Sequence, residues 1–248
     1  MRPAFGGFGG FGGGGLRSTS GKLAIAVVVG SVLWALGRTS GLGALITLSP
    51  HRVLDALWLW QPLTYVVIAT HPISVIFTVL IAYGIGGALE QTWGSRRLLW
   101  VALGYPALAG ILTVLLALVL PGLRAFNFGG APVLLTVLWV AFGWSWGRGQ
   151  TGFWGLPMTG NQLALLGIGF VLLRAVFESW LMVVPELFGI LVTFVAIRMG
   201  HRLPAFSSPR IWWLRFQHRR LERQLKGRSR HLRVVSRDDD PPRRDYLN

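Results

Sequence analysis

One segment of the chain has the spacing of a serine nucleophile. Residues 143–147 are Gly-Trp-Ser-Trp-Gly, the Gly-x-Ser-x-Gly arrangement in which a serine can attack a carbonyl carbon. That chemistry needs a strand, a sharp turn and a helix around the serine, whereas Ser145 ends a long apolar stretch. Small residues at such a place let membrane helices pack closely, and the sequence favours that role for Ser145.

Histidine, the usual base beside a catalytic serine, is dispersed along the chain. His71 lies near Ser74, which raises the question of a Ser-His pair, but Pro72 follows it at the entry of an apolar stretch. An interfacial or hydrogen-bonding role for His71 is therefore favoured. The remaining histidines show no metal-ligand spacing, and neither a metal nor a cofactor is predicted: His51, His201, His218 and His231.

Two acids stand in or beside apolar stretches. Glu186 lies inside a predicted membrane span. Placing an acid there costs free energy, so such a residue is a functional candidate by default. We predict that Glu186 pairs structurally with Arg174 and Glu178; contact with polar groups of a client helix and proton chemistry remain the alternatives. Glu90 is predicted to accept hydrogen bonds from backbone groups or from the turn at 94–95.

The composition places these residues in a membrane. Of 248 residues, 52% are hydrophobic and only 13% are charged, whereas soluble domains carry roughly 25% charged residues. The mean hydropathy is +0.54. The absence of cysteine excludes disulfides, thiolate nucleophiles and cysteine metal sites. The sequence therefore predicts a polytopic membrane protein.

Apolar stretches separated by polar turns predict six transmembrane helices, since about 20 apolar residues span a bilayer. A signal peptide is the alternative for the first stretch. Residues 38–61 are predicted to lie at the membrane interface, residues 148–160 to form a loop, and residues 1–21 to be a disordered glycine- and phenylalanine-rich arm. The six predicted helices lie at 23–37, within 56–89, and at 100–120, 128–147, 161–177 and 180–197.

The distribution of basic residues predicts the orientation. Thirteen of the 24 lysines and arginines lie at 199–248. Most of the others fall on the same predicted side, so both termini should be cytoplasmic, in an inner membrane of bacterial type. Within the basic tail at 201–248, an amphipathic helix at 209–227 is predicted to contact anionic lipid rather than nucleic acid. Its proposed lipid contacts are Trp212, Trp213, Arg215 and Arg219.

Motifs between residues 60 and 99 resemble those of the rhomboid-like superfamily. Trp60 begins a Trp-Gln-Pro-Leu-Thr segment, Gly86 begins Gly-Gly-Ala-Leu-Glu ending at Glu90, and Gly94 lies in Trp-Gly-Ser-Arg-Arg. Gly189 continues the pattern in the sixth predicted helix. The resemblance extends over residues 22–200 and implies an all-α, rhomboid-like bundle of six transmembrane helices. One departure is Gln61, which stands where the family has arginine.

The resemblance also implies which positions would be catalytic, and all of them are occupied by other residue types. Pro132 stands at the nucleophilic serine and Glu186 at the histidine of the sixth helix. Ser74 and Thr78 stand at the histidine and asparagine that support the oxyanion. A serine hydroxyl without a base is not an effective nucleophile. The resemblance therefore implies a pseudoprotease rather than an enzyme.

A second resemblance concerns residues 139–158. Their Trp-Ser-Trp-Gly-Arg end and Phe-Trp-Gly-Leu-Pro turn are similar to those of the Derlin branch, whose members are non-catalytic and handle membrane proteins awaiting degradation. The predicted function is recognition of client transmembrane segments, affecting their stability, traffic or quality control, through Glu186, Thr78 and Ser74. The alternatives are an intramembrane serine protease with a non-standard active site and a structural or lipid-organising membrane protein.

Overall fold

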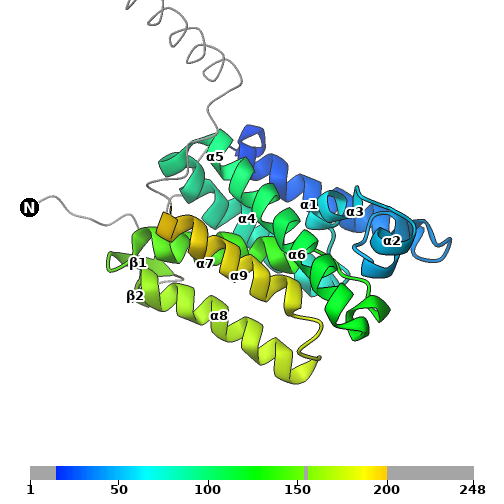
Figure 1. Ribbon diagram of the computed structural model, residues 1–248. Coiled ribbons are helices and arrows are strands. Elements are labelled where there is room, and N and C mark those ends of the chain that lie inside the picture. Colours follow the sequence, from blue (N-terminus) through cyan, green and yellow to red (C-terminus); the bar gives the residue numbers. More distant parts are fainter. Residues whose placement is uncertain (1–14, 154–155, 200–248) are drawn as a thin grey trace, which may run out of the picture. The chain divides into compact units, whose positions relative to one another are not determined.

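The computed structural model describes residues 15–153 and 156–199. Residues 1–14 of the arm predicted at 1–21, and the tail at 201–248 with its amphipathic helix, lie outside these residues. The prediction of disorder is wrong for the end of that arm, where the 3-10 turn η1 (Gly15–Arg17) leads into a capped helix that begins at Thr19. The described chain is mainly helical, with short 3-10 turns between the longer helices (Figure 1). The long helices are α1 (Thr19–Gly37), α4 (Pro72–Trp93), α6 (Tyr105–Val119), α7 (Ala131–Trp146), α8 (Gly160–Phe177) and α9 (Val184–Met199).

Helix α1 begins four residues before the predicted start. Ser18 caps it, because its Oγ accepts a hydrogen bond from the backbone N–H of Gly21 at 3.1 Å. A serine cap followed by small residues allows the helix to start ahead of the apolar run. The predicted first span is confirmed as a helix, with its start corrected to Thr19.

The segment between α1 and α4 folds into short helical turns fixed by one buried amide. These turns are η2 (Leu42–Leu45), α2 (Pro50–Asp55), α3 (Gln61–Thr64) and η3 (Tyr65–Val67). Gln61 is fully buried; its Nε2 donates to the Ala44 carbonyl and its Oε1 accepts from the Ser49 N–H, both at 3.0 Å. The glutamine that departs from the rhomboid pattern thus holds this segment together.

The third long helical segment is continuous over 25 residues, Ser95–Val119. It consists of α5 (Ser95–Leu99), the π-helical turn η4 (Trp100–Gly104) and α6. It is separated from α4 by Gly94, whose φ of +79° lies in the left-handed region that glycine adopts without steric strain. The 3-10 turn η5 (Pro121–Ala125) follows α6, where the Pro-Gly pair predicted a stop.

Helix α7 is the central helix of the described bundle. Helices α4, α6, α8 and α9 all pack against it, and most of its side chains are buried. A helix that is apolar on every face is expected in the interior of a bundle. Figure 1 shows α9 running in front of α7, with α8 along one edge of the bundle.

The predicted loop at 148–160 contains a two-stranded hairpin, so the all-α expectation needs a local correction. Strand β1 (Gln150–Phe153) pairs antiparallel with β2 (Leu156–Thr159). Helix α8 follows directly through a capping box, in which the Thr159 hydroxyl accepts from the Gln162 N–H and the Gln162 side chain accepts from the Thr159 N–H. The turn-forming residues of this segment favoured the prediction of a loop. Each strand has only four residues, too few for an alternating pattern to identify it in the sequence.

Four of the described helical segments are long and apolar enough to cross a membrane: Thr19–Gly37, Pro72–Trp93, Ser95–Val119 and Gly160–Phe177. Helices α7 and α9 have 16 residues each, below the usual length of a full span. Helix α9 begins at Val184 rather than at the predicted Trp180, because a turn at 179–183 precedes it. The structure therefore does not establish six full spans.

Candidate functional site

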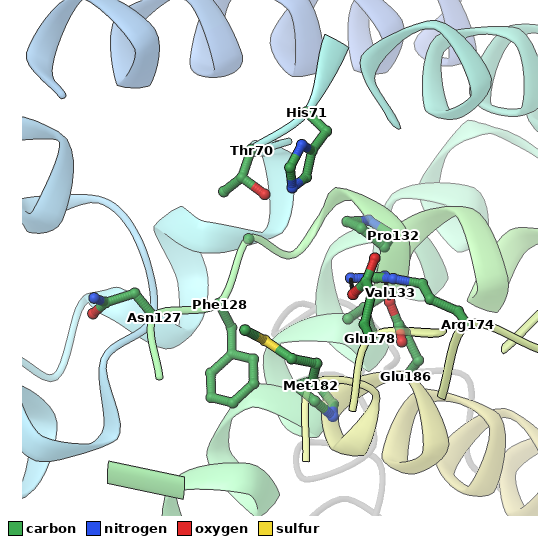
Figure 2. Close-up of a pocket in the computed structure, with 12 residues that line it drawn as sticks. Thr70, His71, Asn127, Phe128, Pro132, Val133, Arg174, Glu178, Met182 and Glu186 are labelled. Atoms are coloured by element: carbon green, nitrogen blue, oxygen red, sulfur yellow. Dashed lines mark hydrogen bonds and ion pairs between the residues drawn. The ribbon is translucent and has the colours of Figure 1, made fainter. Parts of the chain in front are cut away.

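A cavity of about 90 Å³ lies where the ends of four helices meet. Its walls come from the start of α4, the segment leading into α7, the end of α8 and the start of α9. Figure 2 shows three charged side chains, Arg174, Glu178 and Glu186, gathered on one side, with Thr70 and His71 on another. The volume exceeds the roughly 10–15 Å³ that one water molecule needs, so the cavity can hold a small polar group.

Arg174 joins the two carboxylates. Its Nη1 donates to Oε1 of Glu186, and its Nη2 lies 2.9 Å from Oε2 of Glu178. Glu186 is only 3% exposed, and its place in the first turn of α9 is favourable for a carboxylate near the positive end of the helix dipole. The predicted pairing of Glu186 with Arg174 is confirmed.

One oxygen of this cluster has no partner among residues 15–153 and 156–199. Oε2 of Glu186 is buried and forms no hydrogen bond with the described part of the chain. Buried polar atoms in native proteins are nearly always hydrogen-bonded, so an unpartnered carboxylate oxygen beside a cavity needs an explanation. A hydrogen-bond donor that enters the cavity would supply the missing partner.

Two positions that the rhomboid resemblance assigns to catalysis lie on this cavity. Pro132 and Glu186 both line it, although 54 positions separate them in the sequence. Neither carries a hydroxyl or an imidazole. Pro132 fits the start of α7 because a proline in the first turn of a helix lacks only an N–H that would have no partner there.

The backbone that leads into α7 is tied to the turn before α4. Gly130 N–H donates to the Tyr65 carbonyl at 2.9 Å, and Ala131 N–H donates to the Ile68 carbonyl at 3.0 Å. A Cβ on Gly130 would lie 2.7 Å from the Tyr65 oxygen, so only glycine permits this approach. These bonds satisfy irregular backbone in the interior, as a membrane protein requires.

The other residues proposed from the sequence are placed differently. Thr78 is fully buried and donates its hydroxyl to the Ala131 carbonyl at 3.3 Å, while Ser74 is half-buried on α4. Among the described residues that line the cavity, neither of these two appears, whereas His71 does. Ser145 lies at the opposite end of α7 and donates to the Ala141 carbonyl at 2.6 Å, a bond within its own helix.

A known protein family matches most of the chain. Residues 22–199 match the family described as Eukaryotic integral membrane protein (DUF1751). The chain belongs to this family. Searches of curated proteins and of solved structures gave no match. Together with its apolar helices, the assignment makes the chain a multi-pass integral membrane protein, and the description as eukaryotic gives no support to the expected bacterial membrane.

In this member of the eukaryotic integral membrane family, Glu90 acts as a connector between helices. Its Oε1 accepts from the Thr19 N–H at 3.0 Å and from the Ser95 hydroxyl at 2.7 Å, and its Oε2 accepts from the Ser20 N–H at 2.9 Å. The carboxylate at the end of α4 therefore caps the start of α1. The bond to the turn was predicted, but the contact with α1 was not, because no local pattern links positions 70 residues apart.

The remaining motif residues make packing or loop contacts. A Cβ on Gly189 would lie 3.0 Å from Val133, and one on Gly86 would lie 3.5 Å from Ser20, so both glycines allow helices to pack closely. Trp60 donates its indole N–H to the Leu45 carbonyl at 3.1 Å. Among residues 15–153 and 156–199, no three acidic or histidine side chains gather as a set of metal ligands.

Proposed function

We propose that this protein is a rhomboid-like pseudoprotease, which binds transmembrane segments of other membrane proteins and affects their stability, traffic or quality control without cutting them. The observation that carries the proposal is the juxtaposition of Pro132 and Glu186 on one cavity. The rhomboid resemblance places a nucleophile and its base at these two positions. A proline, which carries no nucleophilic group, and an arginine-paired carboxylate stand there instead, so these two positions do not supply a serine with its histidine base.

The arrangement of helices supports the same proposal. Six apolar helical segments form the described bundle, with α7 at its centre, and the two that are short for a full span are α7 and α9. The irregular segment before α7 is buried in protein, which allows a membrane helix to begin inside the bundle. We therefore propose six membrane-embedded helices, with both termini on the cytoplasmic side.

A client helix needs a route from the bilayer to the cavity. Helices α4 and α8 both pack against α7, but within the described bundle they do not pack extensively against each other. The cavity lies between the start of α4 and the end of α8. We propose that a client segment enters laterally between α4 and α8 and places polar groups against the charged cluster.

Photocrosslinking from the cavity tests this function. A photoreactive amino acid at Met182, which lines the cavity, is compared with one at Leu115, which is exposed on α6. Discrete protein adducts, each carrying an uncut client and formed only from Met182, are expected. Identical adducts from both positions, or adducts with lipid alone, would favour a structural or lipid-organising role.

Active-site labelling tests the enzymatic alternative independently. The purified full-length protein is treated with a serine-directed fluorophosphonate. We expect no stoichiometric labelling, because Pro132 and Glu186 occupy the positions that the rhomboid resemblance assigns to the nucleophilic serine and its histidine base. Stoichiometric labelling that is lost on replacement of a single serine would overturn the proposal in favour of an intramembrane protease.

A further inference from the structure

We infer that the cavity is a specificity site that binds the ε-ammonium group of a lysine in the client's transmembrane segment, through the carboxylates of Glu178 and Glu186. This inference rests on the proposed function and adds the chemistry by which a client is selected. It is carried by the unpartnered oxygen of Glu186, by the balance of charge in the cavity and by the cavity's size.

The charges that line the cavity do not balance. Two carboxylates, Glu178 and Glu186, face a single guanidinium, that of Arg174. The formal charges of these three side chains sum to one negative charge. A buried or partly buried carboxylate without a full counter-charge attracts a cation. A client that contributes one positive charge would neutralise the cluster.

The unpartnered oxygen defines what that cation must provide. Arg174 already donates to Oε1 of Glu186 and to Oε2 of Glu178, while no described residue donates to Oε2 of Glu186. An ammonium group carries three N–H donors on one atom and no acceptor. It can therefore bond to Oε2 of Glu186 and to Glu178 together, which a hydroxyl with a single donor cannot.

The dimensions favour lysine over arginine. A cavity of about 90 Å³ admits a group of a few heavy atoms, but no segment of backbone. The lysine ammonium is a compact charge on a flexible stem of four carbons, whereas arginine presents a broad planar group. The stem of the lysine can lie along apolar surface between α4 and α8 while only its charged end enters.

The position of the cavity at the ends of helices also suits a client whose lysine lies near the end of its membrane span. The cavity lies beside the first turns of α4, α7 and α9 and the last turn of α8, so it is near one boundary of the bundle. Lysines close to the ends of membrane spans extend toward the interface rather than remaining in hydrocarbon. A lysine about one turn inside the end of a client span would thus meet the cluster at matching depth.

Binding of synthetic peptides in nanodiscs tests the inference. The full chain is placed in phosphatidylcholine nanodiscs, and energy transfer from its tryptophans to dansylated peptides is measured. The peptides have about 20 apolar residues and differ at one position near one end, which is Lys, Gln or Glu. We expect the Lys peptide to bind about tenfold more tightly than the Gln peptide, as one charge-assisted hydrogen bond provides. The Glu peptide should bind more weakly than either.

Two variants and a matched control assign the preference to the cavity. In E178Q and E186Q the Lys and Gln peptides should bind within about twofold of each other, since each variant removes the excess negative charge. The E178Q variant keeps the test valid if E186Q does not fold, because the Glu178 side chain is 42% exposed. D55N removes an exposed carboxylate outside the cavity, near His51, and should keep the wild-type preference.

Each outcome has a distinct meaning. Equal binding of the Lys and Gln peptides to the wild type would overturn the inference and leave the proposed function standing. Binding of no peptide at all would overturn the proposed function itself. Loss of the Lys preference when phosphatidylethanolamine is added to the nanodiscs would identify a lipid ammonium as the occupant and overturn the assignment to a client lysine.

Discussion

The loss of stability on breaking the ion pair between Arg174 and Glu186 should depend on which of the two partners is replaced. We expect Arg174→Met to destabilise the protein by about 3 kcal/mol, and Glu186→Gln by only about 1 kcal/mol. The asymmetry follows from burial, because the Glu186 side chain is 4% exposed and the Arg174 side chain is 32% exposed. Loss of the arginine leaves a buried carboxylate with no counter-charge.

The two expected losses of stability follow from the burial and the partners of Arg174 and Glu186. Breaking a buried ion pair by removing one partner destabilises by about 3–5 kcal/mol, and the partial exposure of Arg174 places this case at the lower end. Glutamine keeps the shape of Glu186 and can still accept from Arg174, which also retains Glu178 at 2.9 Å. The double variant R174M/E186M removes both charges, so it should be less destabilised than R174M alone.

Equilibrium unfolding in mixed micelles, followed by tryptophan fluorescence, measures these free energies of unfolding. The wild type, R174M, E186M and R174M/E186M form a double-mutant cycle from which the coupling energy of the pair is obtained. A loss for R174M that is no larger than that for E186Q would refute the reasoning. So would a double variant whose loss is the simple sum of those of R174M and E186M measured singly.

Three further predictions concern contacts away from the charged cluster. Glu90→Gln should destabilise by about 1–2 kcal/mol and speed hydrogen exchange at the first two amides of α1, because glutamine keeps only part of the bonding that the carboxylate provides; unchanged exchange would contradict this. Gly143→Ala should destabilise by about 1–3 kcal/mol, since its Cβ would lie 2.6 Å from a carbonyl oxygen of α8. Gly169→Ala, whose Cβ would meet nothing within 4 Å outside its own helix among the described residues, should instead stabilise by up to about 1 kcal/mol in the same unfolding assay. Tyr65→Phe should lower the free energy of unfolding by about 1 kcal/mol, because it removes the 2.5 Å hydrogen bond to the Pro106 carbonyl, and a neutral result would show that this bond contributes no net stability.

Much of the membrane architecture could be predicted from local composition. The apolar stretches located α1, α4, α6, α7, α8 and α9 to within a few residues, because transfer into hydrocarbon depends on the residues of one segment alone. The pairing of Glu186 with Arg174 was also predictable. An acid within an apolar segment needs a partner, and the candidates were few.

Other features depend on which segments meet in space. The sequence placed Ser74 and Thr78 beside Glu186, but the fold turns Thr78 onto the Ala131 carbonyl and brings His71 to the cavity instead. The bonds from Glu90 to the start of α1 and the approach of Gly130 to Tyr65 likewise join distant positions. No local pattern encodes such pairs, since side-chain orientation depends on how whole helices pack.

The amino-acid sequence by itself determined the class of protein, its main helices and the residue types that stand at the positions which the rhomboid resemblance assigns to catalysis. Only the tertiary structure decided that Pro132 and Glu186 share one cavity, and that Oε2 of Glu186 has no partner in the described part of the chain. The physical reason is that hydropathy acts residue by residue, whereas a cavity and an unpaired buried atom are properties of several helices packed together.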